Sequence, residues 1–135
     1  MKRAPFWTQT AALVLLCAAA AVARAADLYV ISNPGTTVEA GELRDIFLGE
    51  KQFAGAVKLV PVDNASAQEA FLSKVMKMEA SKYTAAWTKK TFRDGANPPP
   101  IKGSDTETLE FVKRTAGAVS YVGSAPSGVN IVAKF

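Results

Sequence analysis

The sequence predicts one α/β domain in which a mixed sheet of about four or five strands is flanked by helices. Short apolar runs typical of strands alternate with segments whose apolar residues have helical spacing. These segments follow one another without a linker or an internal repeat, and 135 residues are enough for one domain but not for two. With 49% hydrophobic and 21% charged residues, the composition is that of an ordinary globular protein.

The first 25 residues have the pattern of a secretory signal peptide, so we expect a single domain over residues 26–135. A basic start precedes an apolar run over 11–23, and the small-x-small motif at 23–25 is typical of a cleavage site. A helix over 11–23 would be about 20 Å long, whereas the hydrocarbon core of a bilayer is about 30 Å thick. We therefore expect export to the periplasm and no stable membrane insertion after cleavage.

Residue counts exclude several classes of function. The chain has no histidine, and its one cysteine, Cys17, lies in the predicted signal peptide, so the domain lacks the residues for a His-based triad, a His-ligated zinc or a disulfide. Without Lys2, Arg3 and Arg24 the net charge falls from +4 to +1, and no basic run favours nucleic acid. No nucleophile has an evident base, and no oxygen donors have an EF-hand spacing. We therefore expect no catalysis, no metal or cofactor, and no nucleic-acid partner.

The first expected elements are a strand, a helix and a second strand. Residues 28–31 form an apolar run that ends at a Ser-Asn-Pro-Gly turn. Apolar residues at helical spacing, followed by Gly49 as a left-handed cap, predict a helix over 39–48. Residues 57–62 are expected to form the second strand, with Pro61 near its end, where a missing N–H group does least harm.

Two Ser-x-x-Glu motifs predict the starts of two more helices. Ser66 and Glu69 match a capping box ahead of a helical apolar face, and Ser104 and Glu107 match a second one. In a capping box each side chain binds the backbone N–H of the other residue. The helix opened by Ser104 is expected to end at 115–117. Its amino end also attracts anions, but Asp105 and Glu107 favour capping there.

Between these two helices the sequence predicts a further helix and an extended loop. The spacing of Tyr83, Ala86 and Trp87 predicts a helix over 81–91 that turns these residues towards the core. The alternative is that the two aromatic rings stack on an aromatic ligand. The loop is expected over 93–102, which holds three consecutive prolines, and two final strands over 118–122 and 129–133.

Four segments of the domain match a known pattern in the same order. The segment 41–50 contains Leu-x-Asp-Ile-Phe-Leu-Gly, and 115–122 reads Thr-Ala-Gly-Ala-Val-Ser-Tyr-Val. These resemble the L-x-D-I-F-L-G-K and T-P-G-A-I-G-Y-V segments of phosphate-type substrate-binding proteins of ABC transporters, which are type II periplasmic binding proteins. The segments 60–71 and 83–87 keep the order of that family. The resemblance covers nearly all of the predicted domain and implies the fold of a single lobe.

The resemblance also implies a ligand and partners. A full binding protein of that family closes two lobes on its anion, and this chain resembles only the second lobe. One lobe by itself cannot close over a ligand. The resemblance therefore implies phosphate or another small oxyanion as ligand, and an ABC transporter, another envelope protein or a second copy of this chain as partner.

The ligand loop of that family, D-G-S-G-T, corresponds here to the segment 63–68. In the family, hydroxyls and free N–H groups at the start of a helix hold the phosphate. This chain retains the aspartate, whereas Ala65 and Ala67 stand where the motif has its two hydroxyls. The residues that the resemblance assigns to the ligand are Asp63, Asn64, Ser66 and Gln68.

The residues themselves argue for weakened anion binding at this loop. A capping box of Ser66 and Glu69 would occupy two of the N–H groups that an anion needs, and the Glu69 carboxylate would repel it. The attraction of a helix dipole for an anion is only about 0.3 to 1 kcal/mol at an exposed site. The alternative that these two residues merely start a helix therefore stays open.

The loop after the first strand is a second candidate for ligand contact. In α/β sheets, ligands collect at loops beyond the carboxyl ends of strands. The simpler alternative is a turn with a helix cap at one of its threonines. The residues of this candidate are Asn33, Gly35, Thr36 and Thr37.

A second hypothesis is a non-catalytic accessory domain of the cell envelope that keeps the fold without tight anion binding. The missing lobe and the lost hydroxyls motivate it. Such a domain would use the former cleft surface, around Phe53 and the loop 97–100, to bind another protein or a second copy of itself.

Overall fold

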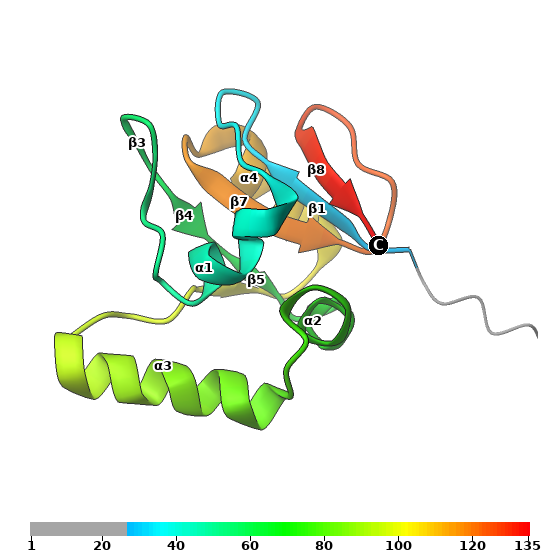
Figure 1. The fold of residues 1–135 in the computed structure, drawn as a ribbon. Coiled ribbons are helices and arrows are strands. Elements are labelled where there is room, and N and C mark those ends of the chain that lie inside the picture. Colours follow the sequence, from blue (N-terminus) through cyan, green and yellow to red (C-terminus); the bar gives the residue numbers. More distant parts are fainter. Residues whose placement is uncertain (1–26) are drawn as a thin grey trace, which may run out of the picture.

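A four-stranded sheet lies at the centre of the computed structural model, which describes residues 27–135 (Figure 1). β1 is antiparallel to both β7 and β8, whereas β4 is parallel to β7. The sheet is therefore mixed, as predicted. The signal peptide predicted for 1–25 lies outside the described residues. Across the sheet the strands are β4 (Val60–Pro61), β7 (Ala118–Val122), β1 (Tyr29–Ser32) and β8 (Asn130–Lys134).

Different helices cover the two faces of this sheet (Figure 1). Successive strand residues point to opposite faces, so Val30 and Tyr121 enter one core while Ile31 and Val122 enter the other. The first core is closed by α1, α2 and α3, and the second by α4. These helices are α1 (Leu43–Phe47), α2 (Gln68–Phe71), α3 (Ala80–Asp94) and α4 (Asp105–Arg114).

Aromatic side chains fill the larger core. The Phe71 ring stacks on Tyr121 with centroids 4.0 Å apart, and the Phe47 ring lies 4.6 Å from that of Phe71. Such pairs add about 0.5 to 1.5 kcal/mol beyond the burial of their area. Tyr83 and Trp87 are also buried in this core, which confirms the core position predicted from their helical spacing.

The predicted strand over 57–62 is broken into parts with different partners. β3 (Val57–Lys58) forms a hairpin with β2 (Phe53–Ala54), whereas β4 pairs with β7. β5 (Asp63–Asn64) pairs with β6 (Ile101–Lys102). One continuous strand was therefore a wrong prediction, because the apolar pattern carries no information on which neighbour each residue pairs with.

The loop predicted over 93–102 is shorter than expected. α3 continues to Asp94 and ends at Gly95, whose φ of 65° is the left-handed cap that glycine favours. The residues after the three prolines again carry backbone N–H groups, so they can pair and form β6. Only residues 95–100 are irregular, so the prediction was wrong at both ends of the loop.

The helix starts also differ from the sequence-based expectation. The N-cap of α2 is Ala67 and no side chain caps it, so the predicted capping box of Ser66 and Glu69 does not form. α2 runs on into a π-helical turn, η2 (Leu72–Met76), and a 3₁₀ turn, η1 (Ala40–Glu42), precedes α1. Ser104 caps α4 as predicted, accepting from the Glu107 N–H at 3.2 Å. The Glu107 side chain instead accepts from the N–H of Gly103.

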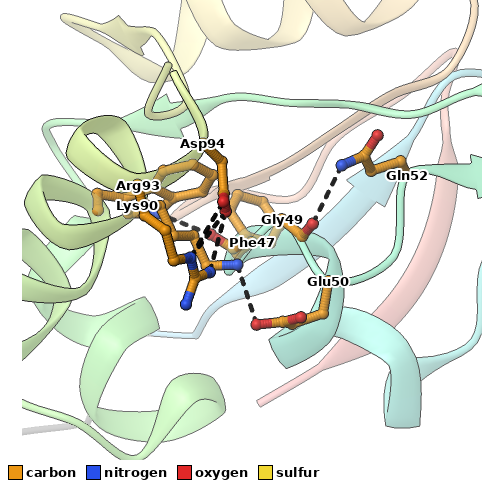
Figure 2. Close-up of polar contacts among 8 residues, drawn as sticks. Phe47, Gly49, Glu50, Gln52, Lys90, Arg93 and Asp94 are labelled. Atoms are coloured by element: carbon orange, nitrogen blue, oxygen red, sulfur yellow. Dashed lines mark hydrogen bonds and ion pairs between the residues drawn. The ribbon is translucent and has the colours of Figure 1, made fainter. Parts of the chain in front are cut away.

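α3 is attached to the rest of the protein through long side chains. The Trp87 indole N–H donates to the carbonyl oxygen of Phe47 at 3.0 Å. Figure 2 shows Lys90 reaching from α3 to Glu50, with a 2.9 Å ion pair, while Arg93 pairs with Asp94 on its own helix. Because Glu50 and the Arg93–Asp94 pair are exposed, these ion pairs contribute little, and the buried Trp87 is the stronger anchor. None of the described helices is long and apolar enough to cross a membrane.

Candidate functional site

At the buried end of the predicted ligand loop, Asp63 lies between two tyrosines. The Tyr83 hydroxyl donates to its Oδ2 and the Tyr121 hydroxyl to its Oδ1, both at 2.8 Å. Burial raises the pKa of the Asp63 carboxyl group above its ordinary value, and the two tyrosine hydrogen bonds offset part of that rise. Asp63 is only 3% exposed, so it joins α3 to the sheet and presents no free oxygen.

Asn64 is fully buried and makes hydrogen bonds with both ends of its side chain. The amide group donates to Asp105 Oδ1 at 2.7 Å and to the carbonyl oxygen of Tyr121 at 3.0 Å. Its Oδ1 accepts from the N–H of Ser66 at 3.1 Å and lies 2.7 Å from the Ser66 hydroxyl. Asn64 therefore fixes the turn that follows β5.

The carboxylate of Asp105 is the acceptor on which this region converges. Its Oδ1 lies 2.7 Å from Asn64 Nδ2 and 3.0 Å from Ser66 Oγ. The Ser66 hydroxyl has one proton, which it shares between Asp105 Oδ1 and Asn64 Oδ1. Its Oδ2 accepts from the N–H of Gly123 at 3.1 Å and from the Ser124 hydroxyl at 3.2 Å. We call these four donors, Asn64, Ser66, Gly123 and Ser124, the donor cluster.

The donor cluster stabilises the ionised form of Asp105. Partial burial by itself would raise the pKa of this carboxyl group, but the hydrogen bonds from the donor cluster together hold the pKa below its ordinary value. All the donors are neutral groups, and no Lys or Arg is among them. Neutral dipoles thus hold this negative charge.

The backbone of the predicted ligand loop is largely committed to internal bonds. The N–H groups of Ala65 and Ala67 donate to the carbonyl oxygens of Lys102 and Asn64. The side chain of Gln68 lines a neighbouring cleft and is half-buried. The N–H groups of 65–67 therefore have internal acceptors, although the capping box does not form.

The second candidate loop is bound to the core of the domain. Asn33 donates from its side chain to the carbonyl oxygens of Val112 and Lys113, and its Oδ1 accepts from the N–H of Gly35. Thr36 is buried and accepts from the N–H of Gly117 at 2.9 Å. Thr37 is exposed. The side chains of Asn33 and Thr36 therefore tie this loop to α4 and to the start of β7.

The two candidate loops lie at opposite ends of β7. Thr36 contacts Gly117, just before this strand, whereas Asn64 contacts Tyr121 near its other end. Four residues of extended strand span about 13 Å. The separation arises because β1 is antiparallel to β7 and β4 is parallel to it, so their carboxyl ends point in opposite directions. The loops do not line one cleft, and a small oxyanion reaches only one of them.

A cleft of about 500 Å³ opens beside Asp63 and Gln68, between α3 and the proline loop. In the described part of the chain, no group of three or more His, Cys, Asp or Glu side chains is arranged to hold a metal ion. Most of the cleft wall is apolar, and its aromatic, proline and aliphatic residues are Tyr83, Trp87, Phe92, Pro98, Pro99 and Ile101.

Sequence reasoning missed Gly123, Ser124 and the role of Asp105. Asp105 was noticed only as a residue that favours capping of its own helix. Residues 123–128 lie between the two final predicted strands, and nothing in their composition indicates that they meet the turn after β5. Asp105 meets donors that lie 18 and 41 positions away in the sequence, and these contacts depend on how α4 packs against the two turns.

Comparison with known proteins finds similarity in structure and not in sequence. No protein-family model and no curated protein matches the chain. PstS from Borrelia burgdorferi is similar with a TM-score of 0.52 and 16% identity, over 73% of this chain and 41% of that one. An ABC-type phosphate transport receptor from Vibrio cholerae has a TM-score of 0.48 and 17% identity, over 79% of this chain and 46% of that one. This chain thus spans less than half of either structure.

The likeness to PstS concerns the fold. The four-stranded mixed sheet flanked by helices has the architecture of one lobe of a periplasmic binding protein, which confirms the predicted fold class. At 16% identity, the likeness carries no information on the ligand.

Proposed function

We propose that this protein is a single-lobe, substrate-binding-protein-like module of the periplasm that binds a small oxyanion such as phosphate with low affinity. The proposal takes residues 26–135 as the exported domain. The fold, which is similar to part of PstS from Borrelia burgdorferi, supports it. A second lobe would come from another envelope protein, from a transporter or from a second copy of this chain.

The donor cluster is the observation that carries this proposal. Its two hydroxyls, one side-chain amide and one backbone N–H already bind an oxyanion, the carboxylate of Asp105. Charge-assisted hydrogen bonds of this kind are roughly twice as strong as neutral ones. Among the candidates from sequence, Asn64 and Ser66 belong to this site. We place the other candidates, Asp63, Gln68, Asn33, Gly35, Thr36 and Thr37, outside the direct ligand shell.

Titration calorimetry with phosphate, sulfate and molybdate tests the proposal. The protein should be purified from the periplasm, so that its processing is that of the cell, and its mass then also tests cleavage after Ala25. We expect a dissociation constant of about a millimolar for the preferred anion, because the described donors of the site are all neutral and already hold a carboxylate. No heat with any of these anions at several millimolar, in the wild-type protein and in variants that open the site, would contradict the proposal.

The outer face of α3 favours a second candidate function, the docking of an acidic segment of another envelope protein. Phe92 is 88% exposed, and a shallow hollow beside it is lined by Ala85 and by neighbouring threonines. Lys89 and Arg93 also line the hollow, and none of the described residues that line it is acidic, although Arg93 already pairs with Asp94 beside it at 2.9 Å. A partner with an apolar anchor and flanking carboxylates would complement this face.

A further inference from the structure

We propose that Asp105 is a built-in ligand, which occupies the donor cluster and must be displaced before an anion from solution can bind. This inference rests on the proposed function where it concerns phosphate. Asp105 thus sets the affinity of the site by competing for it, and its removal should open the site.

The geometry of the contacts is that of a bound ligand. Each oxygen of Asp105 is approached by two donors, Oδ1 from the turn after β5 and Oδ2 from the turn after β7. The donor pairs belong to segments 39 to 41 and 18 to 19 residues away in the sequence. Two separate turns therefore close on one carboxylate.

Capping of α4 does not explain this arrangement. Ser104 is the N-cap, and its hydroxyl oxygen accepts from the N–H of Glu107. The hydrogen bonds of the Asp105 carboxylate go to the donor cluster, and none of them comes from an N–H group of α4. An aspartate at the first helical position usually stabilises its own helix. Here the carboxylate instead points at other segments of the fold.

The site is accessible to exchange with solvent. Ser66, Gly123 and Ser124 are exposed, and only Asn64 is deeply buried. An anion from solution can therefore approach three of the four donors once the Asp105 carboxylate turns away into water. The exchange replaces one set of charge-assisted hydrogen bonds by another, so the net affinity for a free anion is low.

Asp105→Ala tests the inference in the full chain exported to the periplasm. Its melting temperature is measured without added anion and with about 50 mM formate, phosphate or chloride at equal ionic strength. Formate is a free carboxylate of the kind that the variant lacks. We expect the variant to melt lower than wild type, and formate and phosphate to raise its melting temperature by several degrees more than chloride does. Calorimetry should give at least about tenfold tighter phosphate binding than in wild type.

Glu107→Gln is the matched control. It removes one negative charge from the same turn of α4 while keeping an oxygen that accepts from the N–H of Gly103. If it responds to the anions as Asp105→Ala does, general charge repulsion explains the effect and the inference fails. Asp105→Asn is the second variant in case the alanine variant does not fold. Its NH₂ group cannot accept a hydrogen bond, so one of the two donor pairs loses its acceptor and this variant should also bind phosphate more tightly than wild type.

The outcomes separate this inference from the proposed function. A response to formate without any response to phosphate supports the internal ligand and contradicts phosphate binding. Equal phosphate affinity in wild type and Asp105→Ala contradicts the internal ligand and leaves the proposed function standing. If the folded variants respond to neither anion, both ideas are wrong.

Discussion

The side-chain amide of Asn64 lies 2.7 Å from the Asp105 carboxylate and joins the turn after β5 to the first residue of α4. This bond links the segment that resembles a phosphate-binding loop to a helix on the other face of the sheet. It also gives the buried amide a charged acceptor, which makes the bond stronger than a neutral one. The same contact therefore contributes to stability and, under the proposed function, competes with an anion from solution.

Asn64→Ala should lower the free energy of unfolding by about 2 to 4 kcal/mol, because Tyr121 O loses its partner in the buried interior and Ser66 and Asp105 lose theirs in a partly buried turn. Urea denaturation measures the change. Asn97→Ala is the control, since Asn97 is exposed, and its effect should stay within about 0.5 kcal/mol. Equal effects of the two substitutions would mean that the Asn64 hydrogen bonds add no net stability.

The carboxyl groups of Asp63 and Asp105 should have opposite effects on the pH dependence of stability. The pKa of Asp63 is raised in the fold, so its contribution is fully present below about pH 3.8 and is lost as the pH rises through the raised value. The pKa of Asp105 is lowered, so its contribution is present above that pH and is lost as the pH falls through the lowered value.

On acidification from about pH 6 towards pH 3, Asp63→Asn should therefore lose more stability than wild type. Asp105→Asn should lose less stability than wild type, because it lacks the carboxyl group whose lowered pKa makes protonation in the fold unfavourable. Urea denaturation at a series of pH values measures both slopes. Parallel curves for wild type and both variants would contradict these assignments.

Gly117→Ala should be more harmful than Gly55→Ala, although both glycines have positive φ, 83° and 61°. A Cβ atom at Gly117 would overlap the carbonyl oxygen of Lys58, whereas none of the described atoms lies within 4 Å of a Cβ at Gly55. We expect a cost of about 1 kcal/mol at Gly55 from the backbone conformation alone, and at least about 3 kcal/mol at Gly117. Thermal melts of the two variants make the comparison, and equal melting temperatures would mean that the backbone shifts to relieve the overlap.

Phe92→Ala should leave the free energy of unfolding within about 0.5 kcal/mol of wild type, because the ring is 88% exposed. If α3 docks an acidic partner, the substitution should weaken that interaction by at least about tenfold. A labelled helical peptide of Leu, Ala and Glu serves as the probe in fluorescence anisotropy, with a peptide carrying Lys in place of Glu as its counterpart.

Phe53→Ala is the control for the docking surface, since Phe53 is also exposed but lies on the hairpin of β2 and β3. A loss of peptide binding in this variant, with normal binding in Phe92→Ala, would move the docking surface to the hairpin. Equal binding of the acidic and basic peptides would contradict the role of Lys89 and Arg93.

Local patterns were sufficient for the fold class and most of the helices. Leu43, Ile46 and Phe47 repeat at helical spacing and are fully buried, and Ser104 caps the helix that its motif predicts. Spacing of this kind is a property of consecutive residues, so it is readable without knowledge of neighbours. The same reasoning failed at Ser66, where Asn64 and Asp105 bind the hydroxyl that a capping box would have used.

By itself, the sequence determined an α/β domain with buried helical faces, because periodicity and caps act over a few residues. Only the tertiary structure decided the pairing of strands within 57–64, the distance between the two candidate loops and the closure of two turns on Asp105. Strand direction and hydrogen bonds between distant segments depend on which elements pack together, and no local pattern encodes that choice.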